Sequence, residues 1–351
     1  MESFAFWYKK NKGKLDKELS AVMNFNLWSE CGWKKDHSRE NEKPYLDIGF
    51  KVKNLDLAEQ LYFFVPMKIQ LNQIEDLGCK FNKTELVDAV FNERYETTIA
   101  ANTKTIYVQS SNEPDDKFYI YQLDKTHDIQ LEGFADGTIL SIQTQNILNG
   151  PKAQKQNNEE PITTYYFRFR IKDDDLSFLI HSYSTPHSAL QNLFRETYMI
   201  DFRYHNVRSL DKTLVEKFHE QSNAIVNVTA VHFLLITKAY VDVSSNEFSG
   251  GARTIENDIW VDYVDKSDSK DTTDLVAYHY VKKKNKQTQD DKDKFVESSE
   301  LFSKFSVERS VIGKYMVFTV FVGVLGSNFV SIIVFLWKFF VFIWKLLWKI
   351  F

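Results

Sequence analysis

Arginine residues are concentrated in one part of the sequence, where they could form an anion-binding site. Five of the nine arginines lie between positions 168 and 208. Arg168 and Arg170 are two residues apart on an expected strand, so their side chains share one face of it. Arg203 and His205 share one face of another expected strand, and Arg208 follows. If the two strands are neighbours, the guanidinium groups converge and can hold a phosphate or carboxylate through paired hydrogen bonds.

This arginine-rich segment has two interpretations. The structural one, which we favour, is a solvated sheet face on which the arginines pair with acidic side chains of neighbouring strands. The functional one is an anion site, and it implies a phosphorylated ligand, a nucleic acid or a lipid headgroup as the partner.

Sequence motifs of catalysis, metal binding and phosphate binding are absent. The chain has no GxxxxGK[ST] loop, no GxSxG elbow and no HExxH helix, and its eight histidines are scattered. Cys31 and Cys79 form no metal-binding spacing, and the three aspartates at 173–175 are expected to form an exposed turn. Gly250 and Gly251, the only adjacent glycines, are expected to lie in a loop. We therefore predict a protein that is not an enzyme and that uses no cofactor and no metal.

Composition favours a β-rich soluble part in a reducing compartment. Aromatic residues make up 15% of the chain, and Phe and Tyr favour strands. The net charge is −4, and the last forty residues hold four lysines and no acid, which leaves −8 on the rest. This acidic balance argues against broad nucleic-acid binding. Two cysteines in 351 residues are typical of reduced proteins, and the first nineteen residues lack the order of a signal peptide. We therefore expect the soluble part to be cytosolic.

Alternation of apolar and polar residues predicts about a dozen short strands and few helices. Residues 45–53 and 60–70 are expected to form an antiparallel pair, and Asp136-Gly137 predicts a hairpin turn between 128–134 and 138–147. Further strands are expected at 23–27, 104–109, 117–123, 165–172, 176–181, 198–205, 224–243, 257–264 and 274–282, and helices at 82–91, 186–195 and 211–222.

These elements predict a mainly β fold, with a β-sandwich or barrel-like soluble region. The most polar break, 149–161, is interpreted as a linker or as a long loop. Residues 1–148 form the first β-rich domain or half and 162–281 the second, and a relation between two halves is kept as a hypothesis. Residues 282–310 begin with a highly charged stretch, which predicts a solvated tether that continues helically towards its end.

The last forty residues predict a membrane-bound tail. Residues 315–337 contain no formal charge, and about 20 apolar residues are enough to cross a hydrocarbon core. We assign 311–337 as a transmembrane helix of a single-pass membrane protein whose N-terminal region is cytosolic. A re-entrant hairpin turning at 326–328 is the alternative, but its first arm would be about 22 Å long, short for a full crossing.

Small side chains recur every four residues within this predicted span. They form one stripe along a helix, where a second helix can approach closely. An amide beside the stripe needs a hydrogen-bond partner in hydrocarbon, and both features favour a homo-oligomer that associates through the helix. The helix-association residues are Thr319, Gly323, Ser327, Asn328 and Ser331.

Residues 338–351 predict an amphipathic helix that lies in the membrane interface. Lysines and tryptophans recur there with the same spacing on adjacent strips, and indole rings prefer the membrane–water boundary. The membrane-interface residues are Trp337, Lys338, Trp344, Lys345, Trp348 and Lys349.

Two functions fit this layout. The first is a membrane-tethered effector whose cytosolic β-rich part senses a ligand or a partner protein and controls assembly of a tail that perturbs the bilayer. This arrangement is similar, in layout only, to the membrane-acting effectors of bacterial antiviral systems. The second is a passive, tail-anchored scaffold that recruits partner proteins to the membrane.

Overall fold

The computed structural model describes residues 2–12, 18–29, 44–99, 103–152, 161–172, 176–183, 195–244, 247–264, 274–284, 295–308 and 312–350. These residues belong to two compact units. The first is β-rich and comprises residues 1–183 and 197–307, and the second comprises 184–196 and 308–351 and includes the C-terminal helices.

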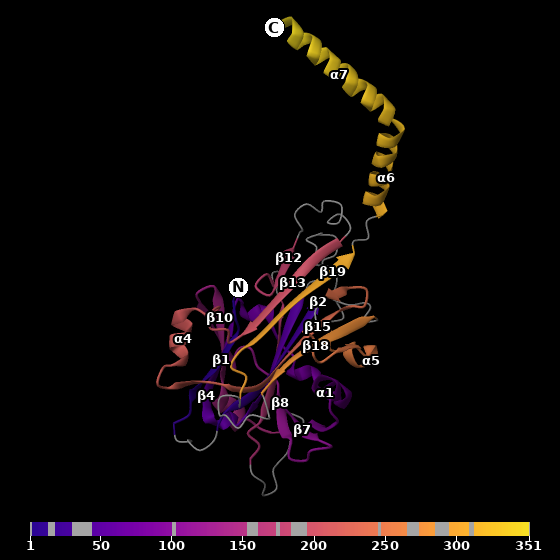
Figure 1. The fold of residues 1–351 in the computed structure, drawn as a ribbon. Helices are drawn as coiled ribbons and strands as arrows, with labels where there is room; N and C mark the ends of the chain where they lie inside the picture. Colours follow the sequence, from indigo (N-terminus) through magenta and orange to yellow (C-terminus); the bar gives the residue numbers. More distant parts are fainter. Residues whose placement is uncertain are drawn as a thin grey trace. The chain divides into compact units, whose positions relative to one another are not determined.

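A ten-stranded sheet runs through the β-rich unit, and the predicted mainly β fold is confirmed (Figure 1). Neighbours along it are antiparallel except for two parallel pairs, β15 with β2 and β11 with β8. In order across the sheet its strands are β17 (Ala252–Thr254), β18 (Leu275–Lys283), β15 (Asn227–Lys238), β2 (Ser20–Ser29), β3 (Tyr45–Lys53), β11 (Tyr165–Lys172), β8 (Lys117–Tyr121), β7 (Thr105–Ser110) and β6 (Tyr95–Ile99), and β5 (Ile74–Asp76) also pairs with β11.

Two smaller sheets accompany it in the described part of the chain. The Asp136-Gly137 hairpin is confirmed, since β9 and β10 pair around it. The five-stranded sheet has the order β14 (Asn223–Ile225), β1 (Ala5–Lys10), β4 (Ala58–Val65), β10 (Gly137–Gln143) and β9 (Ile129–Phe134). The four-stranded sheet has the order β12 (Ile180–Tyr183), β13 (Arg195–Tyr204), β19 (Ser299–Glu308) and β16 (Asp242–Ser244).

One aromatic core joins the three sheets. Ring centroids of Phe50 and Phe63 lie 6.2 Å apart, which joins β3 to β4. Phe202 of β13 contacts Phe25 of β2 at 4.8 Å and Phe233 of β15 at 4.9 Å. All five side chains are at most 1% exposed, so the alternate residues of these strands drive the sheets together.

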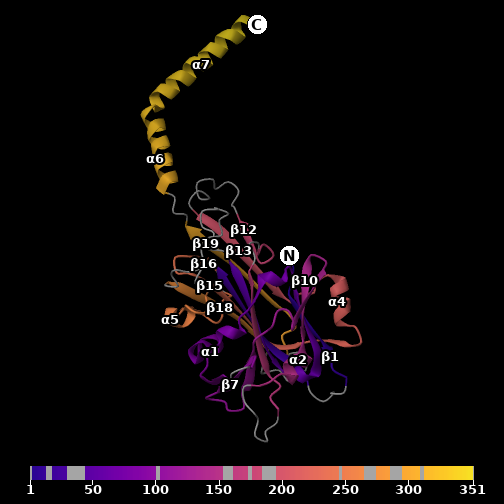
Figure 2. The ribbon, with the colours of Figure 1, turned by 180° about the vertical axis from the view of Figure 1, so that it is seen from behind.

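The opposite face of the ten-stranded sheet carries a second hydrophobic core, beside which lie the buried polar groups described below. Trp28 packs on Trp260 with ring centroids 5.8 Å apart, and Phe91 packs on Tyr166 at 4.7 Å. The helices that contribute to this face are α1 (Thr84–Phe91) and α5 (Asn257–Trp260). Helix α4 (Lys212–Phe218) lies beside β1 and β10 in both Figure 1 and Figure 2, and α2 (Thr144–Asn149) follows β10.

Short turns of 3₁₀ helix connect several strands of this unit. They are η1 (Leu55–Leu57), η2 (Leu71–Gln73) and η3 (Gly78–Lys80). The predicted helices at 82–91 and 211–222 correspond to α1 and α4, and the Asp211 carboxylate accepts a hydrogen bond from the Thr213 N–H at 2.7 Å as an N-cap.

Several sequence-based expectations differ from the structure. Residues 45–53 and 60–70 do not pair, because β3 and β4 belong to different sheets. Residues 257–260 form α5, not a strand, and residues 299–308 of the predicted tether form β19, whose alternate residues Leu301 and Phe305 are buried. Local alternation cannot identify a strand's partner, which explains the wrong pairing. The predicted helix at 186–195 lies almost wholly outside the described residues.

The two predicted halves contribute strands to the same sheet. β2 and β3 of the first half lie next to each other, between β15 and β11 of the second half. Residues on both sides of 149–161 therefore belong to one compact unit, and of this segment the structure describes only its ends.

The C-terminal segment forms two helices, α6 (Ile312–Ser327) and α7 (Phe329–Ile350), which Figure 1 shows meeting at a bend. Among the described residues, only α7 is long and apolar enough to cross a membrane, over Phe329–Trp348. Its 22 residues extend about 33 Å, whereas the 16 residues of α6 extend about 24 Å. The large apolar side chains described in α6 and α7 are exposed.

The boundary between the two helices therefore lies at Asn328 and not at Trp337, the position that the sequence predicts. The Asn328 side chain donates to the Val324 carbonyl at 2.9 Å, and the Ser327 hydroxyl donates to the same carbonyl at 3.1 Å. The Asn328 N–H also donates to the Val324 carbonyl, at 3.1 Å, and side chains that add hydrogen bonds to a carbonyl of the preceding turn tend to bend a helix.

This boundary changes how the predicted helix-association and membrane-interface residues are distributed between the two helices. The stripe of small residues is interrupted, since Thr319 and Gly323 lie in α6 and Ser331 lies in α7. All six predicted interface residues instead lie in α7, from Trp337 to Lys349.

Candidate functional site

The structure places Arg168 and Arg170 in the interior of the β-rich unit. They are 1% and 0% exposed, on the second-core face of β11. Arg170 Nε donates to Asp47 Oδ1 at 2.7 Å, and its Nη2 donates to Asp47 Oδ2 at 3.2 Å. Asp47 lies on β3 directly opposite Arg170. The pair is therefore a buried, two-point ion pair.

Aromatic side chains complete the surroundings of this pair. Tyr263 accepts a hydrogen bond from Arg168 Nε at 2.5 Å and donates to Asp47 Oδ2 at 2.7 Å. Trp28 Nε1 also donates to Asp47 Oδ2, at 2.8 Å. The burial of Tyr263 raises its pKa, so its hydroxyl remains a donor. These contacts give Arg168 and Arg170 a structural role. We call Asp47, the two arginines and the aromatic residues bonded to them the Asp47 cluster.

Gly49 provides the space in which the second tyrosine of the cluster sits. The Tyr166 hydroxyl accepts from Arg168 Nη1 at 2.8 Å. A Cβ on Gly49 would lie 2.4 Å from that hydroxyl, closer than atoms can approach. A glycine in a central strand often marks such a close approach, and here it admits the tyrosine that binds Arg168.

The remaining predicted anion-site residues lie elsewhere. β13, which carries Arg203, pairs in a different sheet from β11, so the required juxtaposition of the two arginine strands is not present. Arg203 binds Asp201 on its own strand through two bonds of 2.8 Å. Arg208 is exposed in the turn that follows β13. The structure therefore does not bring the five predicted residues into one site.

His205 is buried, and it holds the first strand in place. Its Nε2 accepts a hydrogen bond from the Phe6 N–H at 2.9 Å, which requires the neutral imidazole. Burial lowers the pKa of His205 to about 4, although the Phe6 carbonyl, 3.2 Å from Nε2, opposes this shift because it can accept a hydrogen bond from the protonated ring. Its backbone is in the left-handed region, with φ of 49°.

We expect the β-rich unit to lose stability in mild acid because of His205. The folded-state pKa is lower than the unfolded-state value of about 6.5, so the unfolded chain binds more protons as the pH falls below 6.5. His205 alone should reduce the free energy of unfolding by about 2 kcal/mol between pH 7.5 and pH 5. Urea unfolding at both pH values measures this. His205→Asn, which suits a left-handed position, should show a smaller pH dependence, and an equal one would contradict the assignment.

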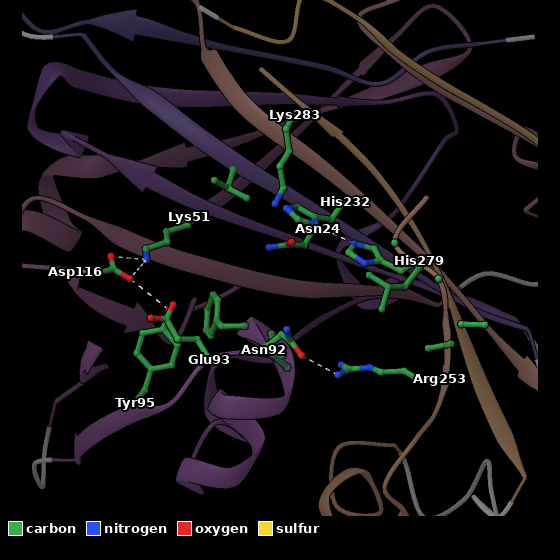
Figure 3. A pocket seen from close by; sticks show the side chains of 18 residues that line it. Asn24, Lys51, Asn92, Glu93, Tyr95, Asp116, His232, Arg253, His279 and Lys283 are labelled. Atoms are coloured by element: carbon green, nitrogen blue, oxygen red, sulfur yellow. Dashed lines mark hydrogen bonds and ion pairs between the residues drawn. The ribbon is translucent and has the colours of Figure 1, made fainter. Parts of the chain in front are cut away.

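A cavity of about 470 Å³ opens on the same sheet face as the Asp47 cluster (Figure 3). It lies between the strands β2, β3, β15 and β18 on one side and the end of α1 and the start of β17 on the other. Its polar lining residues are Asn24, Lys51, Asn92, Glu93, Tyr95, Asp116, His232, Arg253, His279 and Lys283.

A pair of histidines forms one end of this cavity. His232 Nδ1 and His279 Nε2 are 2.9 Å apart, and the rings are stacked with an interplanar angle of 13°. Burial, together with the neighbouring His279 and Lys283, lowers the pKa of His232 to about 4. The pKa of His279 is also lowered, chiefly by burial. Figure 3 shows the Lys283 ammonium beside the His232 ring.

The other end of the cavity contains acidic and aromatic groups. Lys51 Nζ donates to both carboxylate oxygens of Asp116, at 2.7 and 2.8 Å. The Tyr95 hydroxyl lies 3.2 Å from Glu93 Oε2 and 3.3 Å from Asp116 Oδ2, and burial raises its pKa. Burial lowers the pKa of Lys51, and the Asp116 carboxylate opposes that shift. At this end Lys51 is therefore paired with Asp116, while the Glu93 carboxylate accepts hydrogen bonds from the Tyr95 and Ser110 hydroxyls.

The sequence alone does not predict this cavity. Its residues come from positions 22 to 283, and the sheet order brings them together. Two signals were present in the sequence, namely a histidine within the most hydrophobic strand and the single glycine pair. Gly250 lies against His279, where a Cβ would be 2.3 Å from the ring Nδ1.

The described residues hold no group of three or more His, Cys, Asp and Glu side chains that could bind a metal ion. A scan against protein-family models finds no match for this chain, and no curated protein sequence matches it.

Proposed function

We propose that this protein is a membrane-tethered effector whose β-rich unit binds a small ligand in the cavity and thereby controls its C-terminal helices. The observation that carries the proposal is the polar cavity of about 470 Å³, which is within the size range of small-molecule sites. Converging polar groups with shifted pKa values are characteristic of such sites.

The connectivity of the chain supports a link between the cavity and the helices. Lys283, a cavity residue, is the last residue of β18. The next strand along the chain is β19, and α6 follows it. A ligand that contacts Lys283 therefore acts on the part of the chain that leads into the membrane element.

The C-terminal helices supply the proposed membrane activity. α7 is long and apolar enough to cross a bilayer, and the exposed apolar side chains of both helices require lipid or other helices to cover them. We place the β-rich unit in the cytosol and propose that copies of the chain associate through these helices. A role in bacterial antiviral defence is part of this proposal because the layout is similar to that of such effectors.

The proposal is tested with the full chain and a version that ends at Ser310, expressed in a bacterium from an inducible promoter. The full chain should associate with membranes and lower the membrane potential reported by a voltage-sensitive dye. The shorter version should remain soluble and leave the potential unchanged. A full chain that is membrane-bound but never alters the potential or growth would support the passive scaffold instead.

A further inference from the structure

The histidine end of the cavity contains more positive charge than its neighbours compensate. Lys283 extends from β18 beside His232, and the Asn24 side chain lies next to them in Figure 3. Lys51 binds Asp116, and Arg253 binds the Asn92 side chain at 2.9 Å and the Ala89 carbonyl at 3.2 Å. The charged and titratable groups that line the cavity around the two imidazoles are Lys51, Glu93, Tyr95, Asp116, Arg253 and Lys283.

The two imidazoles share one hydrogen bond and can therefore accept one proton as a pair. In the neutral pair, one ring donates to the other, so only one of the two outer nitrogens carries a hydrogen. After one proton is added, both outer nitrogens are donors and the hydrogen bond between the rings is retained. A second proton would place a hydrogen on both nitrogens of that bond and break it. The pair therefore changes between zero and one positive charge.

Charge matching identifies the kind of ligand that this end can bind. Lys283 and a singly protonated imidazole pair together carry two positive charges. A phosphate monoester carries about −1.5 to −2 at pH 7 and offers three acceptor oxygens, whereas a carboxylate carries a single charge. A dianionic, tetrahedral oxyanion therefore matches both the charge and the number of donors that this end offers.

We propose that the His232–His279–Lys283 end of the cavity binds the phosphate group of a small phosphate monoester, and that the imidazole pair takes up one proton when it binds. This rests on the cavity being the ligand site of the proposed function, and it specifies the ligand's chemical class. The free pair is largely neutral because burial lowers the pKa of both rings. The bound anion favours the charged pair, so binding and proton uptake are linked.

The test uses sulfate as the probe, because sulfate remains a dianion across the relevant pH range and cannot itself account for proton uptake. Calorimetric titration of the full chain in detergent should show affinity for sulfate rising as the pH falls from 7.5 to 5.5, by up to about tenfold per pH unit. Titration in buffers of different ionisation enthalpy should show uptake of up to one proton. Affinity independent of pH, with no proton uptake, would overturn the proposal.

Substitutions assign the effect to individual residues. Lys283→Gln should weaken sulfate binding by about 10- to 100-fold, as expected for loss of one charge-assisted hydrogen bond. Lys284→Gln removes the same charge outside the cavity lining and should bind normally. His232→Gln with His279→Gln should abolish the pH dependence. Equal binding by the Lys283 and Lys284 variants, with unfolding curves that match the unsubstituted chain, would contradict the site.

Two further probes distinguish the source of the phosphate group. Glycerol 1-phosphate in solution and short-chain phosphatidic acid in detergent micelles carry the same headgroup chemistry, and preference for one identifies a soluble ester or a lipid. Sulfate binding without any change in membrane potential would retain this site and reject the effector function. A change in membrane potential that depends on cavity residues, without any oxyanion binding, would retain the effector function and reject this site.

Discussion

Replacing Asp47 with alanine is expected to lower the free energy of unfolding by about 3–5 kcal/mol, the cost of leaving a buried charge without its partner. Asp47 is 0% exposed and accepts hydrogen bonds from Arg170, Tyr263 and Trp28. Without it, two guanidinium groups remain buried in the unit with only neutral hydrogen-bond acceptors around them. Chemical denaturation of purified protein, followed by Trp fluorescence, measures the change.

A surface aspartate provides the matched comparison for this experiment. Asp262 pairs with Lys83, and both side chains are about half exposed. Asp262→Ala should cost at most about 1 kcal/mol because exposed pairs contribute little. Combining Asp47→Ala with Arg170→Met should cost less than the sum of the two single substitutions, since the uncompensated charge is removed. Equal losses for Asp47→Ala and Asp262→Ala would show that the cluster is not a stabilising ion pair.

Replacing Lys338 with leucine is expected to abolish the membrane depolarisation that we propose for the full chain, while its membrane association is retained or increased. A crossing by Phe329–Trp348 places Lys338 near the middle of the hydrocarbon core. A lysine there costs about 2.5–3.5 kcal/mol in insertion, so its presence indicates a function in the membrane such as lining a water-filled path between associated helices. Dye fluorescence measures depolarisation, and membrane fractionation measures association.

Lys345→Leu is the control for this substitution. Lys345 lies close to the end of the apolar stretch, where a long side chain reaches the interface at little cost. Its replacement should change depolarisation much less. If Lys338→Leu depolarises membranes as strongly as the unsubstituted chain, Lys338 does not contribute to a conducting path.

The fold class was predictable because it depends on local alternation. Met23, Phe25 and Leu27 pack into the first core, as their spacing predicts, while Trp28 packs into the second. The burial of Arg168 and Arg170 and their pairing with Asp47 could not be predicted in the same way. Arg–Phe–Arg alternation is the same for a solvated face and for a buried ion pair, and the partner Asp47 lies 123 residues from Arg170.

The cavity was unpredictable for a related reason. A parallel pairing has no hairpin to indicate it, so the adjacency of β2 and β15 leaves no local signal. That adjacency places Asn24 directly opposite His232, and the pairing of β15 with β18 places His279 beside them. The residues of the histidine end are individually ordinary, and only the sheet order makes them a site.

The parallel pair at the centre of the large sheet also bears on how the chain folds. Ser20 of β2 is aligned with Asn227 of β15, about 200 residues later. The chain loses conformational entropy when it closes such a long loop, before the contacts between the two strands stabilise it. Folding should therefore be slow for the size of the unit. During synthesis, β2 must wait for β15 with one backbone edge unpaired, a state that favours aggregation. A ribosome-bound fragment ending before β15 is therefore expected to need chaperones, and the ligand binding that we propose can appear only after β18 has been made.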